Sequence, residues 1–147
     1  MHVCLRIALV AVVLVLSVLV MAGAQDAQPP DDLKAAVDKM ITAFEEGTYD
    51  DLEAMTADEI GVVLGFPPEA EVVTAQRWDF LNELRNVGKI QVDDESVQIS
   101  RMGAAATARA IVTVPMGGAE TKASTELILV QQGGKWMLRG LIAGPAA

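Results

Sequence analysis

The sequence has a single cysteine, Cys4, and a single histidine, His2, and both lie near its N-terminus. A domain without cysteine is not held together by disulfides, and it has no thiol nucleophile or thiolate metal ligand. A domain without histidine lacks the commonest general base and the commonest metal ligand. Removal of the N-terminal segment would therefore exclude most familiar catalytic constellations, and what remains does not identify a substrate.

The N-terminal segment has the three-part order of a secretory signal peptide. Arg6 supplies a positive charge, an apolar run covers residues 7–21, and Ala22-Gly23-Ala24 supplies small residues before Gln25. We therefore expect a signal peptide over residues 1–24, cleavage after Ala24, and a secreted or periplasmic protein. In the alternative, the uncleaved run nearly spans a bilayer and forms a single N-terminal anchor, with the domain outside the cytoplasm.

Basic residues are scarce compared with acidic ones. Cleavage of 24 of the 147 residues leaves 123, enough for one domain with one core. Without Arg6 this part holds 10 Lys and Arg against 20 Asp and Glu, a net charge of −10. Such a surface repels phosphate backbones and acidic membranes. We expect no nucleic-acid partner and no membrane contact after cleavage. Charge alone favours neutral or cationic partners, and a small neutral or anionic ligand is possible.

The first half of the domain reads as helical. Residues 25–30 form a short polar leader, and the domain follows over residues 31–147. A helix begins at Asp31 or Asp32 and ends at Gly47, because its apolar residues share one face: Leu33, Val37, Met40, Ile41 and Phe44. Capping patterns at Thr48 and Thr56 predict two short helices over residues 48–55 and 56–64, and a longer helix is expected over residues 69–86.

From Lys89 onward the apolar residues recur every second position, which predicts strands. The expected strands cover residues 90–92, 97–101, 105–114, 121–131 and 135–142, and Gly117-Gly118 and Gly133-Gly134 form hairpin turns. Helices followed by hairpin-linked strands indicate an α+β fold, with N-terminal helices packed on an antiparallel sheet.

The segment 127–130 is apolar at every position, so both faces of the sheet need cover there. The helices can cover only one face. A second copy of the chain is the simplest cover for the other, and we expect a homodimer through the sheet; a C-terminal segment is the alternative. One of Ile128 and Leu129 then lies in the core and the other at the interface.

Two segments carry a family resemblance. Residues 41–52 (ITAFEEGTYDDL) look like an opening helix, a glycine break and a second helix, and residues 129–138 (LVQQGGKWML) look like a closing hairpin. The chain resembles the nuclear transport factor 2-like (NTF2-like) superfamily, the curved α+β cone shared by SnoaL-like polyketide cyclases, ketosteroid isomerases and many uncharacterised secreted domains. Neither motif is catalytic. The resemblance implies a pocket between the concave sheet face and the helices.

Enzymes of this superfamily often use carboxylates or tyrosine, so the missing histidine does not exclude catalysis. A carboxylate buried among apolar neighbours would have a raised pKa and could act as a general acid or base. The polar residues that could line the pocket are Tyr49, Asp79, Arg101, Arg109, Glu126 and Arg139.

Each candidate also has a structural interpretation. Arg101 shares the apolar face of its strand with Val97 and Ile99, so it either pairs with an acid such as Glu126 or holds an anionic ligand. Arg109 and Glu126 fit a polar sheet face with cross-strand charge pairing. Tyr49 fits helix packing, and Asp79 fits a solvated helix surface.

No metal site or cofactor is expected. The acids at 93–95 do not have the spacing of a calcium loop, and neither Gly-Gly pair opens a helix as a phosphate loop does. Trp78 and Trp136 are interpreted as core or interface anchors rather than stacking platforms.

Three functions remain open. The first is an exported small-ligand-binding or accessory domain of unknown specificity, without assigned catalytic activity. The second is a structural or protein-interaction domain that dimerises through its sheet. The third is a cofactor-independent enzyme of the isomerase, dehydratase or cyclase kind.

Overall fold

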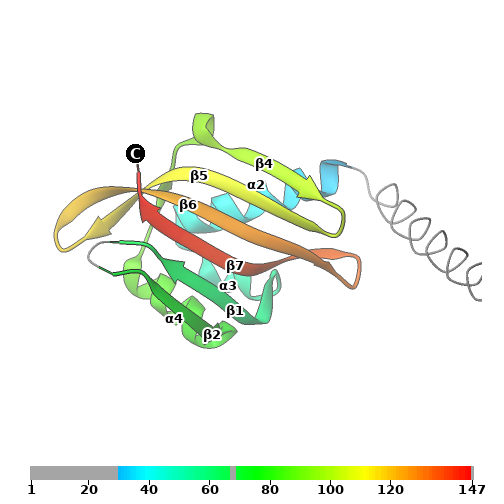
Figure 1. Ribbon diagram of the computed structural model, residues 1–147, viewed down its shortest axis with the longest axis horizontal. Helices are drawn as coiled ribbons and strands as arrows, with labels where there is room; N and C mark the ends of the chain where they lie inside the picture. The colour runs from blue at the N-terminus through cyan, green and yellow to red at the C-terminus, as the bar shows by residue number, and fades with distance from the viewer. Residues whose placement is uncertain (1–29, 67–68, 147) are drawn as a thin grey trace, which may run out of the picture.

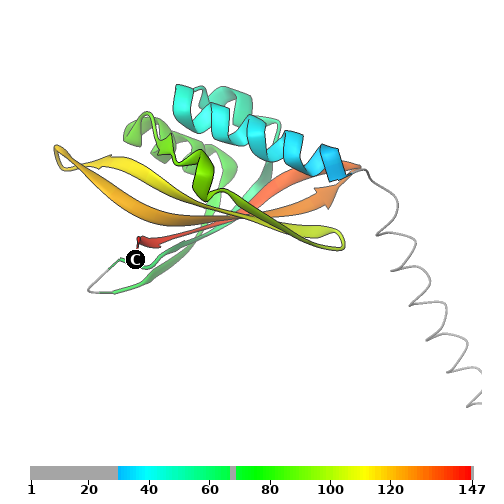
Figure 2. The same ribbon diagram turned by 90° about the horizontal axis from the view of Figure 1, so that it is seen from above.

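The computed structural model describes residues 30–66 and 69–146. The expected signal peptide, its cleavage site and residues 25–29 of the leader lie outside the described residues. In the described part, three α-helices pack against one face of a strongly curved sheet (Figures 1 and 2). This arrangement confirms the α+β class.

The sheet has seven strands in the order β2-β1-β7-β6-β5-β3, and β4 also pairs with β5. The strands are β1 (Thr56–Leu64), β2 (Glu71–Gln76), β3 (Gln91–Val92), β4 (Gln98–Met102), β5 (Ala105–Met116), β6 (Ala119–Gln132) and β7 (Lys135–Pro145). The pairing of β1 with β7 is parallel, and the other pairings are antiparallel. The sheet is therefore mixed, whereas the sequence predicted an antiparallel one.

The first two helices form where the sequence predicts them. Helix α2 (Pro30–Glu46) buries its apolar stripe against the sheet and ends at Gly47, whose φ of 71° suits glycine. Helix α3 (Tyr49–Glu53) follows directly, with Asp50 and Asp51 in its first turn, where negative charge suits the helix dipole. The expected capping box is absent, because the Thr48 side chain makes no capping hydrogen bond.

The prediction of helices over residues 56–64 and 69–86 is wrong in most of its length. Residues 56–64 form β1, residues 71–76 form β2, and α4 (Arg77–Val87) begins only at Arg77. The two strands pair with each other, with Val62 opposite Val73 and Ile60 opposite Ala75. Runs of β-branched residues favour strands, and here strand pairing outweighs the helix-start patterns.

The second half of the chain confirms the predicted strands and turns. Hairpins join β5 to β6 and β6 to β7, and all four glycines of the two turns have positive φ, as the tight hairpin turn requires. The acidic turn at 93–95 overlaps a single 3₁₀ turn over Asp94–Ser96.

The core lies between the concave sheet face and the helices. Leu127, Leu129 and Trp136 belong to it, whereas Ile128 and Val130 lie half-buried on the opposite, convex face. The predicted division of residues 127–130 between two faces is therefore confirmed, as is the core position of Trp136, which is 4% exposed.

Candidate functional site

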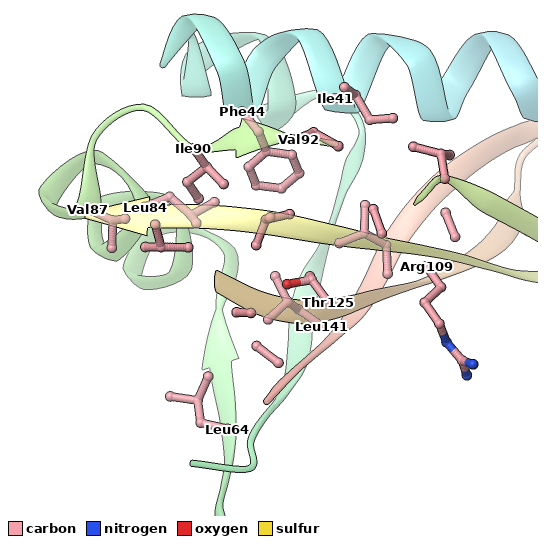
Figure 3. Close-up of a pocket in the computed structure, with 18 of the residues that line it drawn as sticks. Ile41, Phe44, Leu64, Leu84, Val87, Ile90, Val92, Arg109, Thr125 and Leu141 are labelled. Atoms are coloured by element: carbon pink, nitrogen blue, oxygen red, sulfur yellow. The ribbon is translucent and has the colours of Figure 1, made fainter. Parts of the chain in front are cut away.

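An apolar cavity of about 270 Å³ lies between the concave sheet face and helices α2 and α4 (Figure 3). The helices contribute Val37, Ile41 and Phe44 from α2 and Leu84 and Val87 from α4. Strands β5, β6 and β7 contribute the floor. The pocket that the fold resemblance implied is therefore present.

The space between the sheet and the helices stays unfilled because the strands carry small side chains where they face the helices. Alternate positions of β5 hold Ala108, Ala110 and Val112, and Ala123 on β6 and Ala143 on β7 lie nearby. Larger residues at these positions would fill the space, since protein interiors are otherwise close-packed. The strand sequence thus creates the cavity directly.

The cavity lining is almost entirely apolar. Of the described residues that line it, only Arg109 and Thr125 have polar side chains. The Thr125 side chain lies among the apolar lining residues, whereas the Arg109 guanidinium is directed away from them (Figure 3). No carboxylate, tyrosine or lysine is among the described lining residues. The lining therefore offers one hydroxyl group for hydrogen bonding and no group for general acid–base catalysis.

The cavity opens to solvent at one end. The lining side chains Val87 and Met116 are exposed, Met116 by 51%, and Leu64 and Phe66 are half-buried. Methionine is flexible and adapts to differently shaped apolar surfaces. A ligand that entered here would meet an apolar rim before it met the apolar interior.

Tyr49 supports the cavity wall from behind rather than lining it. Its ring is buried and meets Phe44, a lining residue, edge to face at 6.1 Å between ring centroids. Its hydroxyl donates a hydrogen bond to the Gly88 carbonyl, and burial raises the pKa of the Tyr49 phenol above 10.0. These contacts connect α3 to α2 and to Gly88, the residue that follows α4.

Arg101 lies on the concave face, as its position in the strand predicts, but it does not line the cavity. Its Nε donates to the Gly103 carbonyl at 3.0 Å, and its guanidinium lies over the Trp136 ring. Glu126, the partner that the sequence suggested, pairs with Arg109 instead.

Arg109 and Glu126 pair with each other across β5 and β6, with Nη2 and Oε2 3.1 Å apart. Arg109 is among the lining residues of the cavity, but its guanidinium is directed away from the cavity (Figure 3), and Glu126 is not a lining residue. Asp79 is exposed in the first turn of α4, and Arg139 is exposed on β7. The structure thus brings Arg109 and Glu126 together and leaves the other candidates apart.

Of the candidate residues only Arg109 lines the cavity, because sequence reasoning searched for polar groups and the lining is almost entirely apolar. The available signal was the alternation of alanine on one face of residues 105–114. Sequence reasoning also interpreted Trp78 as a core or interface anchor, and the structure excludes the core position because 68% of this residue is exposed.

Within residues 30–66 and 69–146, no group of three or more acidic, histidine or cysteine side chains is placed to hold a metal ion. In the same part of the chain, no helix is long and apolar enough to cross a membrane.

The curved sheet, the helices on its concave face and the apolar cavity between them define a cone-shaped α+β domain. The chain belongs to the family of SnoaL-like domains, whose model matches residues 33–139, and hence to the NTF2-like superfamily. No curated protein matches it in sequence.

Solved structures of low sequence identity share the fold. An NTF2-like protein from Cytophaga hutchinsonii has a TM-score of 0.62 at 9% identity, and the match covers 81% of this chain and 99% of that one. A suspected dehydratase of the NTF2-like family from Streptomyces avermitilis has a TM-score of 0.59 at 16% identity, covering 80% and 95%. An NTF2-like protein of unknown function from Pseudomonas putida also has a TM-score of 0.59, at 11% identity, covering 78% and 84%.

Proposed function

We propose that this domain binds a small, predominantly apolar ligand in the cavity beneath α2. The observation that carries the proposal is the lining, which is apolar except for Thr125 at its centre and Arg109, whose charged end is directed away. An apolar ligand gains free energy from burial there, whereas a charged one would lose its hydration without an ionic partner.

The ligand must be small and carry little polar surface. Typical ligand pockets start at about 300 Å³, and this cavity has about 270 Å³. A single hydroxyl or carbonyl group on the ligand could pair with the Thr125 hydroxyl, and the rest of the molecule would contact hydrocarbon side chains.

Fluorescence titration tests this function. Phenylnaphthylamine, a neutral apolar dye, should bind saturably with enhanced emission, and medium-chain alkanols should displace it. Their carboxylate analogues should compete less well, because the one cation among the described lining residues, Arg109, directs its guanidinium away from the cavity. Absence of saturable dye binding, or stronger competition by the carboxylates, would contradict the proposal.

We also propose that the domain works outside the cytoplasm. The support is the order of charged, apolar and small residues over positions 1–24. Intact-mass analysis of protein from a secreting host should find Gln25, or its cyclised form, at the N-terminus. A species that retains Met1 would favour the membrane anchor instead.

A second proposed role is self-association through the convex face. Apolar side chains gather there on β1, β6 and β7, where Val63, Ile128 and Met137 are half-buried and Ile142 is exposed. Contiguous exposed apolar surface is typical of an interaction site. This role is compatible with ligand binding, since the cavity opens on the other side of the sheet.

A further inference from the structure

Helices α3 and α4 lie on the same side of the molecule as β1 and β2 (Figure 1). Residues of these four elements line a second groove, of about 300 Å³. It shares no residue with the apolar cavity. Five of its seven lining residues have polar side chains, namely Glu53, Asp58, Gln76, Arg77 and Arg85, and the other two are Trp78 and Leu81. Nothing in the apolar cavity's function requires this composition.

Helix α4 separates the two sites because its two faces differ. Phe80 and Leu84 on one face are buried in the core. Trp78 and Arg85 on another face line the groove together with Leu81, which is buried beneath it. The exposed indole of Trp78 thus forms a flat apolar wall beside polar groups, a combination that aromatic residues provide at binding surfaces.

Two arginines of the same lining each make an ion pair. Arg77 Nη1 lies 3.1 Å from Asp58 Oδ1 and donates to the Thr56 carbonyl at 3.3 Å. Arg85 Nη2 lies 2.5 Å from Asp50 Oδ1. Each guanidinium has five N–H donors, and the Arg77 contacts use only Nη1. Oriented donors therefore remain for a ligand.

The charges of the groove balance. Arg77 and Arg85 are matched by Glu53 and Asp58 in the lining, so an anion would be repelled about as strongly as it is attracted. The groups that remain are planar donors and acceptors beside one aromatic face. Such a set suits a ligand that is neutral, carries many hydroxyl groups and has an apolar face.

From this combination we infer that the groove binds a neutral carbohydrate. The C–H face of a pyranose ring stacks on the Trp78 indole. Its hydroxyl groups accept from Arg77, Arg85 and the Gln76 amide, and they donate to the carboxylates of Glu53 and Asp58. Each sugar hydroxyl both donates and accepts, which matches a lining that offers both kinds of group.

Tryptophan fluorescence gives a direct test, because the sequence has two tryptophans and only Trp78 is exposed. Maltose, cellobiose or diacetylchitobiose is titrated into the protein, and the quenching of tryptophan emission by acrylamide is measured at each sugar concentration. Galacturonate serves as an anionic comparison. At least one neutral disaccharide should protect Trp78 saturably. Protection by none of them, or by galacturonate alone, would overturn the inference.

Calorimetry on variants then locates the site. Trp78→Ala and Gln76→Ala should each weaken disaccharide binding, the first by about tenfold or more, and neither should unfold the protein because both side chains are exposed. Met102→Ala, at an exposed apolar residue outside the groove, should bind as the wild type does. Unchanged affinity in Trp78→Ala would overturn the inference. Ala110→Leu, which fills the apolar cavity, should leave sugar binding intact and so separates the two sites.

Discussion

The guanidinium carbon of Arg101 lies 5.3 Å from the centre of the Trp136 ring. A cation at this distance from an aromatic face is attracted to it. The contact joins the end of β4 to the beginning of β7 across the concave face, beyond the residues that line the cavity. Arg101 and Trp136 therefore contact each other outside the cavity lining, and we expect their contact to stabilise the fold rather than to bind the ligand.

Trp136→Ala should destabilise the domain strongly. Truncation of a buried aromatic side chain costs about 3–5 kcal/mol, so the Tm should fall by about 10 °C or more. Trp78→Ala is the matched control, because that indole is exposed, and its Tm should stay close to that of the wild type. Equal thermal melts for the two variants would contradict the core assignment of Trp136.

Arg101→Met should lower stability modestly and leave dye binding unchanged. The substitution keeps an unbranched apolar side chain but removes the cation over Trp136 and the hydrogen bond to Gly103. We expect a loss of about 1–2 kcal/mol in the free energy of unfolding, measured by urea denaturation. Lost dye affinity with unchanged stability would assign Arg101 to a ligand site instead.

Tyr49→Phe should change how stability depends on alkaline pH. The unfolded phenol ionises near pH 10, and burial raises the pKa of the folded one. The Tyr49 contribution is therefore complete below pH about 10 and is lost as pH rises toward the folded pKa. The variant also loses the hydrogen bond to Gly88. In the variant, the decrease in the free energy of unfolding that Tyr49 ionisation causes above pH about 10 should be absent. Tyr49 is the only tyrosine in the sequence, and identical alkaline slopes in urea unfolding would contradict the assignment.

Ile128→Asp and Leu129→Asp should have different effects, although the two residues are neighbours. Leu129 is fully buried, and an unpaired charge there is costly enough to prevent folding. Ile128 lies on the convex face, where Asp should leave the fold intact and turn the proposed dimer into a monomer. Circular dichroism and light scattering separate the outcomes. A wild-type protein that is already monomeric would contradict the dimer.

The C-terminal half of the fold could be predicted because local signals agreed there. Residues 105–142 combine apolar residues that recur mostly at every second position with Gly-Gly turns, so period and turn chemistry point to the same hairpins. Residues 56–76 could not be predicted in this way. The pattern beginning at Thr56 resembles a helix start, and the choice of strand depends on pairing with β7, which is far away in the sequence.

The cavity was beyond sequence reasoning for a different reason. The alternation of apolar and polar residues predicts which face of a strand is buried. It does not show whether the side chains of the opposing helices contact that face. Ala108 and Ala110 are compatible with a filled core or with an empty one. Only the distance that the curved sheet keeps from α2 decides between them, and that distance depends on the whole fold.

Binding of phenylnaphthylamine to paired leucine variants tests the central claim most directly. Ala110 lines the cavity, and Ala105 lies on the opposite face of the same strand. Ala110→Leu should fill part of the cavity and weaken dye binding by about tenfold or more, whereas Ala105→Leu should bind as the wild type does, with both variants folded by circular dichroism. Equal affinities for the two variants would contradict an apolar ligand site beneath α2.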